Sequence, residues 1–291
     1  MTGVEEANIR GLEIDKVVKA VKYMEYVFKS DVTVSPTKSD AIRWYNKTTF
    51  GTLSATAPNT GVNISPLSRF PTIESSVTRN TSYIRKYGYT DFISMEDIDG
   101  ADIDMLALTV MDLTKAVIRD VDTRIYDVMT KNRAGVTGAA TDINLITTSG
   151  GWNDGASNPL RDIFAAQRVL WISGGYAAGN PTLYLSPLDY ENLRSYLVFS
   201  KGSSVPQLSS TLAGNGVLAE IGGVKIKVSP NVTADYAVLA LPSIAVTWKQ
   251  FADTTSTVID HPGIGKEIRI WEIGEAINVS PKAVVLISNT Q

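Results

Sequence analysis

The single histidine of the chain, His261, follows Asp260 directly, and an Asp–His pair could act in acid–base catalysis. Two observations argue against that role. Side chains of adjacent residues point to opposite faces of a strand. In addition, Pro262 and Gly263 follow at once, and this dipeptide is typical of a turn. We therefore interpret His261 as a surface turn residue rather than a catalytic base.

Two glycine-containing segments match phosphate-binding motifs only in part. Residues 260–267 include a Gly-Lys dipeptide, but they lack the first Gly and the final Ser or Thr of a phosphate loop. Residues 214–219 begin like a dinucleotide-binding fingerprint but place Ala219 where the third Gly belongs. The Gly-x-Ser-x-Gly nucleophile motif is missing as well. The sequence therefore predicts no enzyme, no catalytic residue and no bound cofactor.

Four aspartates, Asp97, Asp99, Asp102 and Asp104, could supply oxygen ligands to a hard cation. Their spacing departs from the EF-hand pattern, and the closing Glu of that pattern is missing. Acidic side chains are also stabilised at the N-terminus of a helix, and we interpret the cluster in that way. With no Cys and one His, the chain cannot assemble a zinc site from N and S ligands. We expect no metal site.

Length and composition favour an ordinary globular protein. The chain has 291 residues, 44% of them hydrophobic, which suits one large domain or two modest ones. Its formal net charge of −3 lacks the basic excess of a typical nucleic-acid-binding domain. Neither a secretory signal nor an apolar run of about 20 residues is visible. We expect synthesis in the cytoplasm and no membrane partner.

The most informative segment runs from Asn46 to Ser82, where 14 of 37 residues are Ser or Thr. So few large apolar residues remain that they cannot offset the cost of ordering the backbone, about 1–2 kcal/mol per residue. Aromatic, strand-like runs at residues 42–45 and 83–87 flank the segment and look paired. We interpret the whole as a two-stranded extension that lies on another subunit, which favours an assembly protein over a monomeric enzyme.

Helical periodicity predicts four helices. The first covers residues 8–29, and a long one runs from Ala101 to Lys131, about 45 Å at 1.5 Å per residue. Two shorter helices begin at Asn158 and Ser186, where a capping residue precedes Pro. Residues 134–158 and 200–216 are interpreted as loops.

Alternation of apolar and polar residues predicts strands mainly in the second half of the chain. A hairpin is expected around Gly222 and Gly223. The other predicted strands cover residues 83–93, 181–185, 236–241, 245–248, 257–260, 268–273 and 283–287. Helices and strands are segregated rather than strictly alternating, so the predicted fold class is α+β.

The order of these parts resembles the major capsid proteins of tailed double-stranded DNA viruses, which share the HK-ninety-seven-like fold with encapsulin shells. The local resemblance lies in a strand, Ser-Pro cap and helix at 180–193, a hairpin at 221–231 and a closing strand at 271–284. It implies an α+β capsid fold with five parts. They are an N-terminal arm (1–40), an extended β-hairpin loop (41–93), a peripheral domain with a long spine helix (94–150), an α/β axial domain (151–242) and C-terminal strands returning to the peripheral domain (243–291).

The resemblance implies a structural protein that self-assembles through pentamers and hexamers into an icosahedral shell around double-stranded DNA. The implied partners are further copies of the chain, DNA bound without sequence preference, and portal, scaffolding and decoration proteins. The implied location is the virion. Some relatives join subunits by a Lys–Asn bond on the extended loop, but this chain has no Lys between Thr48 and Arg85, so we expect a non-covalent shell. An encapsulin-type cargo shell and a soluble α+β enzyme or binding protein are the alternatives.

We expect the extended loop to contact a neighbouring subunit through apolar anchors and ion pairs. The ion pairs would join the basic flank of the loop to the acidic base of the spine helix. The predicted contact residues are Leu53, Ile64, Leu67, Arg69, Phe70, Arg79, Arg85, Asp97, Asp99 and Asp102.

Overall fold

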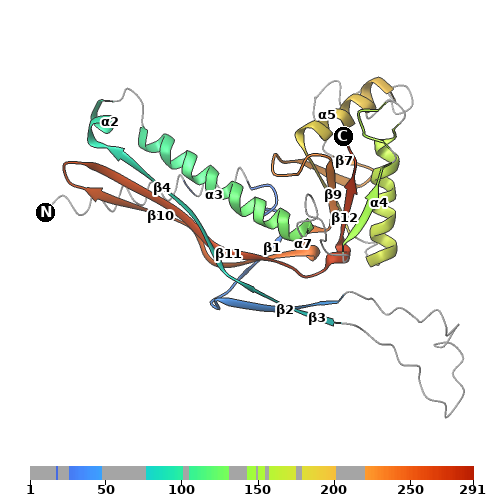
Figure 1. Ribbon diagram of the computed structural model, residues 1–291, viewed down its shortest axis with the longest axis horizontal. Helices are drawn as coiled ribbons and strands as arrows, with labels where there is room; N and C mark the ends of the chain where they lie inside the picture. Colours follow the sequence, from blue (N-terminus) through green and yellow to red (C-terminus); the bar gives the residue numbers. More distant parts are fainter. Residues whose placement is uncertain are drawn as a thin grey trace, which may run out of the picture.

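The fold consists of two sheets of different shape and a two-stranded ribbon that projects from the body (Figure 1). A long four-stranded sheet carries helix α3 on one face, and a six-stranded sheet packs against α4 and α5. The computed structural model describes residues 18, 26–47, 77–100, 105–130, 143–148, 150–154, 157–174, 179–200 and 220–291.

The four-stranded sheet has the strand order β1-β10-β11-β4. Its strands are β1 (Thr33–Pro36), β10 (Val246–His261), β11 (Gly265–Asn278) and β4 (Arg85–Ser94). Strands β10 and β11 form one long antiparallel hairpin. Here the predicted strands at 245–248 and 257–260 are confirmed except at Ala245, but the break expected between them was wrong, because β10 is continuous. Its polar, Thr-rich middle resembles a loop in sequence, but Thr is a β-branched residue that favours strands.

Helix α3 (Met105–Thr130) lies along this sheet and confirms the predicted long helix over its described residues. Val117, Val121 and Ile125 repeat every four residues and are fully buried, so one stripe of the helix faces the sheet. The prediction that the acidic cluster begins this helix was wrong for Asp97 and Asp99. They belong to a separate short helix, α2 (Met95–Gly100). Asp102 and Asp104 lie outside the described residues.

The ribbon consists of β2 (Ala41–Lys47) and β3 (Val77–Tyr83), paired antiparallel from Ala41 opposite Tyr83 to Lys47 opposite Val77. The predicted two-stranded extension is therefore confirmed, but its predicted pairing was wrong, because residues 42–45 pair with residues 79–82 rather than with residues 83–87. Most of the predicted flank 83–87 enters β4 instead and pairs with β11.

The six-stranded sheet has the order β5-β12-β9-β6-β8-β7. Its strands are β5 (Asn144–Thr147), β6 (Thr182–Leu185), β7 (Glu220–Ile221), β8 (Val224–Val228), β9 (Tyr236–Ala240) and β12 (Val284–Ser288). Gly222 and Gly223 have φ of 56° and 81°, as the turn of a tight hairpin requires, and the predicted hairpin is confirmed. Strand β5 corrects the prediction of a loop over 134–158. Two strands of this sheet, β5 and β12, lie outside residues 151–242, the range predicted for the axial domain. The division into five parts stays a prediction.

The remaining helical elements connect or cover the sheets. They are α4 (Pro159–Gly174), α5 (Pro187–Ser195), the π-helical turn η1 (Tyr196–Ser200), α7 (Pro242–Ala245) and the 3-10 turn η2 (Pro281–Ala283). Ser186 caps α5 by accepting the N–H of Asp189 at 3.1 Å, which confirms the predicted start of this helix. In the predicted N-terminal helix, Val18 is helical, but residues 26–29 are not, and the rest lies outside the described residues.

Candidate functional site

The base of the ribbon is tied to the body by a chain of polar contacts. Trp44 on β2 donates its Nε1–H to the backbone oxygen of Asn278 at 2.8 Å. The Asn278 side chain in turn donates to the backbone oxygen of Val128, near the end of α3, at 3.2 Å. These two bonds join the ribbon, the end of β11 and the end of the long helix, so they set where the ribbon leaves the molecule.

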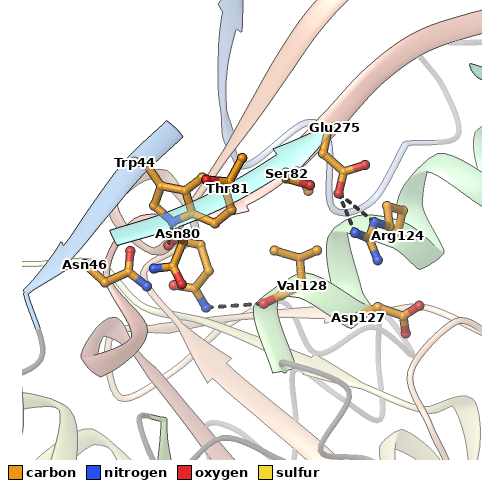
Figure 2. A pocket seen from close by; sticks show the side chains of 11 residues that line it. Trp44, Asn46, Asn80, Thr81, Ser82, Arg124, Asp127, Val128 and Glu275 are labelled. Atoms are coloured by element: carbon orange, nitrogen blue, oxygen red, sulfur yellow. Dashed lines mark hydrogen bonds and ion pairs between the residues drawn. The ribbon is translucent and has the colours of Figure 1, made fainter. Parts of the chain in front are cut away.

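An ion pair lies beside this chain of contacts. Arg124 on α3 donates to Oε1 of Glu275 through Nε at 3.0 Å and also through Nη2 (Figure 2). Glu275 is fully buried, while Arg124 is 21% exposed. Arg85, at the start of β4, places its Nε 3.6 Å from the other oxygen of Glu275. The pair anchors α3 to β11 where the ribbon begins.

A solvent-open pocket of about 280 Å³ lies between the ribbon, α3 and the end of β11 (Figure 2). Eight of its eleven lining residues are polar or charged. The lining residues are Trp44, Asn46, Asn80, Thr81, Ser82, Arg124, Asp127, Val128, Glu275, Ala276 and Asn278.

A second polar cluster holds the turn at residues 26–32, where the N-terminal segment joins the body. The buried carboxylate of Asp122 on α3 accepts the backbone N–H groups of Val27, Phe28 and Lys29 at 2.7, 3.3 and 3.0 Å. Burial raises the pKa of Asp122 to about 6, against the opposing effect of these three hydrogen bonds. The carboxylate takes over backbone donors that a continuing helix would use internally, which explains why the predicted helix does not extend to residue 29.

Glu272 on β11 is the centre of this cluster. It accepts a hydrogen bond from Tyr26 Oη at 2.6 Å, and the Lys29 ammonium pairs with it inside the fold. Trp248 Nε1 and Thr254 Oγ1 also donate hydrogen bonds to this carboxylate, at 3.1 and 3.0 Å. Burial, with Glu272 adding to it, raises the pKa of Tyr26 above its usual range. Because four donors surround it, Glu272 is a buried charge that is fully hydrogen-bonded.

The same turn also reaches the six-stranded sheet. Asp31 accepts a hydrogen bond from Tyr184 Oη on β6 and forms an ion pair with Lys227 on β8, both at 2.7 Å. The turn at 26–32 therefore contacts the long helix and both sheets.

The structure places the predicted contact residues in three ways. Arg79 on β3 and Asp97 on α2 are exposed, and Asp97 accepts a hydrogen bond from Ser94. Arg85 and α2 lie at opposite ends of β4, about 30 Å apart at 3.3 Å per residue, so the structure does not bring these charges together within one subunit. Asp99 lies in α2. Outside the described residues are Leu53, Ile64, Leu67, Arg69, Phe70 and Asp102.

Asp260 and His261 point to different partners, as the sequence predicts. Lys266 lies 3.7 Å from Asp260, whereas His261 Nε2 lies 3.4 Å from Glu267. His261 is 42% exposed at the end of β10, beside the turn. The prediction of a surface turn residue is confirmed.

Sequence reasoning missed Glu272 and Glu275. Both carboxylates interrupt the apolar segment from Ile268 to Ile277, and a charge in a buried strand is a signal that a partner exists. The partners Lys29 and Arg124 lie far away in sequence, so their identity could not be read from β11 alone.

Comparison with solved structures shows the fold. The chain is similar to a virus-like particle from Pyrococcus furiosus, with 12% identity, a TM-score of 0.64 and coverage of 94% of this chain and 98% of that one. It is also similar to the capsid of Cyanophage P-SCSP1u, with 13% identity, a TM-score of 0.65 and coverage of 90% and 88%. A chain of Mycobacterium phage Ogopogo is similar as well, with 18% identity, a TM-score of 0.61 and coverage of 90% of this chain and 91% of that one. A comparison with curated proteins gave no match.

Within the part of the chain that the structure describes, no helix is both long and apolar enough to cross a membrane. The likeness to capsids confirms the predicted α+β, HK-ninety-seven-like architecture. The model of the phage capsid protein family matches residues 79–285, which is most of the sequence. The chain therefore belongs to the phage capsid protein family and is a structural protein of a capsid shell.

Proposed function

We propose that the chain assembles through pentamers and hexamers into an icosahedral shell that encloses double-stranded DNA. The observation that carries the proposal is the projecting ribbon. Tyr45 and Tyr83, one on each of its strands, are 63% and 70% exposed, so the ribbon offers apolar surface that its own subunit leaves uncovered. The two paired strands extend away from the body (Figure 1).

The energetics of a closed shell support this role for the ribbon. Burial of apolar surface contributes about 25 cal/mol per Å², from which the costs of association are subtracted. Each contact between subunits can be weak and the closed shell still be stable, because every subunit makes several contacts that act together.

The predicted contact residues fit an arrangement between subunits. Arg85 and α2 lie at opposite ends of β4, so an ion pair between Arg85 and α2 can form only between two molecules. Arg69, Arg79 and Arg85 would face Asp97, Asp99 and Asp102 of a neighbour. The apolar anchors Leu53, Ile64, Leu67 and Phe70 would pack on the same neighbour.

Deletion of residues 53–73 tests the proposal. Negative-stain microscopy of the purified full-length chain should show closed shells, and the deletion variant should show none or shells of much lower heat resistance. Intact shells of undiminished heat resistance from the deletion variant would rule out the role of the loop. Charge reversal at Arg79 is a finer test. Unchanged assembly of that variant would show that the proposed ion pairs do not contribute to assembly.

The contents of the shell separate two candidates. The likeness to a virus-like particle keeps a protein-cargo shell of encapsulin type as the second candidate. Nucleic acid inside purified shells, protected from nuclease, supports the virion, and a protein cargo in its place supports the alternative. Subunits that separate fully in hot detergent would support non-covalent assembly. Portal, scaffolding and decoration proteins are further partners of the proposed virion.

A further inference from the structure

Three buried oxygens at the ribbon-base pocket lack a hydrogen-bond partner among the described residues. They are Oδ1 of Asn46, Oδ1 of Asn278 and Oε2 of Glu275. Their residues are 3%, 3% and 0% exposed, and all three line the pocket. A buried acceptor without a donor costs about 1–3 kcal/mol, so three around one pocket indicate a group that binds there.

The chemistry of that group follows from the lining. Because the three unpartnered atoms are all acceptors, the bound group supplies donors. Two carboxylates, Glu275 and Asp127, face one lining guanidinium, that of Arg124, which leaves an excess of negative charge. Arg85 offsets little of it, since it is 60% exposed and does not line the pocket. A positively charged group with several N–H donors fits these conditions.

Size and ligand count argue against a single water and a metal ion as occupants. A volume of about 280 Å³ is far larger than the roughly 30 Å³ that one water occupies, so one water does not fill the pocket. Among the described residues, no group of three or more His, Cys, Asp or Glu side chains could hold a metal ion. An ammonium or a guanidinium group on a flexible stem suits both the space and the acceptors.

We propose that the ribbon-base pocket receives a Lys or Arg side chain from a second copy of this chain. The inference rests on the proposed function, because a shell holds a second copy against this surface in a fixed geometry. Asn46 belongs to the ribbon, whereas Glu275 and Asn278 belong to β11, so a cation bound to all three fixes the ribbon against the body. Binding of the neighbour therefore sets the direction in which the ribbon leaves its own subunit.

The substitution Asn46→Leu tests the inference through two opposite effects. In the unassembled subunit it removes an unpartnered acceptor, so the thermal midpoint should stay unchanged or rise. In the shell it removes a ligand of the neighbour's cation, so the subunit concentration needed for assembly should rise at least fivefold. A role in folding alone would move both measurements in the same direction and would overturn the inference.

Two matched variants sharpen this test. Asn46→Asp keeps the acceptor and adds a negative charge, so it should assemble at least as readily as the wild type at pH 7. Asn180→Leu is the same Asn-to-Leu substitution at an exposed position before β6. It should change neither the thermal midpoint nor the subunit concentration needed for assembly. Weaker assembly of Asn46→Asp, with an unchanged thermal midpoint of the unassembled subunit, would show that the incoming group is not a cation.

A cryo-electron microscopy map of the wild-type shell provides the direct observation. Density for a Lys or Arg side chain that enters the pocket from a neighbouring backbone confirms the inference. Isolated density for water or a small ion, or an empty pocket, overturns it while the proposed function stands. A wild-type chain that forms no shell overturns both.

Discussion

Two buried glutamates, three residues apart on β11, have opposite surroundings. Glu272 accepts from Lys29, Tyr26, Trp248 and Thr254, so both of its oxygens are occupied. Glu275 uses one oxygen for Arg124, and its other oxygen has no hydrogen-bond donor among the described residues.

The difference separates a contact that completes the subunit from one that a neighbour can complete. The cluster around Glu272 lies inside the molecule and fixes the turn at residues 26–32. The cluster around Glu275 lines a pocket at the surface, where the ribbon leaves the body. Removal of the charge partner should therefore cost far more stability at Glu272 than at Glu275.

The largest effect is expected for Lys29→Met, which leaves Glu272 as a buried carboxylate without a cation. Removal of one partner of a buried ion pair costs about 3–5 kcal/mol, a large part of the stability of an ordinary domain. Urea unfolding of subunits, kept below the concentration at which they assemble, measures this loss. A loss under about 1 kcal/mol would mean that the Lys29–Glu272 pair does not stabilise the subunit.

The next effect is a pH dependence that arises from Asp122. Its pKa is raised from 3.8 to about 6, so between these values the folded chain binds more protons than the unfolded chain. Stability contributed by this group is therefore greatest below about pH 4 and falls as the pH rises to about 6. A shift of this size corresponds to at most about 3 kcal/mol, at 1.36 kcal/mol per unit.

Asp122→Asn isolates this contribution, because Asn does not titrate. Unfolding free energies between pH 4 and pH 6 should fall less steeply with pH in the variant than in the wild type. The comparison uses the slopes, since the loss of one carboxylate oxygen also lowers stability at every pH. Equal slopes in the two proteins would contradict the assignment to Asp122.

The features that sequence predicted best depend on local signals. Ser186 before Pro187 marked the start of α5, and Gly222 with Gly223 marked the hairpin, because capping and positive φ restrict the residue types at those positions. Continuity of β10 was missed because a Thr-rich strand and a polar loop have similar compositions.

The two buried clusters could not be predicted for a different reason. The hydrogen bond between Lys29 and Glu272 joins residues 243 positions apart, and such a distance is fixed only by the tertiary fold. The predicted inter-subunit contacts could not be worked out from the sequence for a similar reason, since they depend on the assembly of several subunits. Residue types can indicate an extended loop, but the partner surface depends on how whole subunits meet.

The smallest effect is expected for Arg124→Met, the counterpart of Lys29→Met on the other glutamate. It removes two hydrogen bonds to a charged oxygen, and the loss should be about 2 kcal/mol, below that of Lys29→Met. The reason is the exposure of the cation: Arg124 is 21% exposed and Lys29 only 6%, so water screens the ion pair of Arg124 more than that of Lys29. Urea unfolding of both variants under identical conditions gives the comparison. Equal losses would mean that water screens the Arg124–Glu275 pair no more than the Lys29–Glu272 pair, and the pocket beside it could not then admit a side chain from a neighbouring subunit.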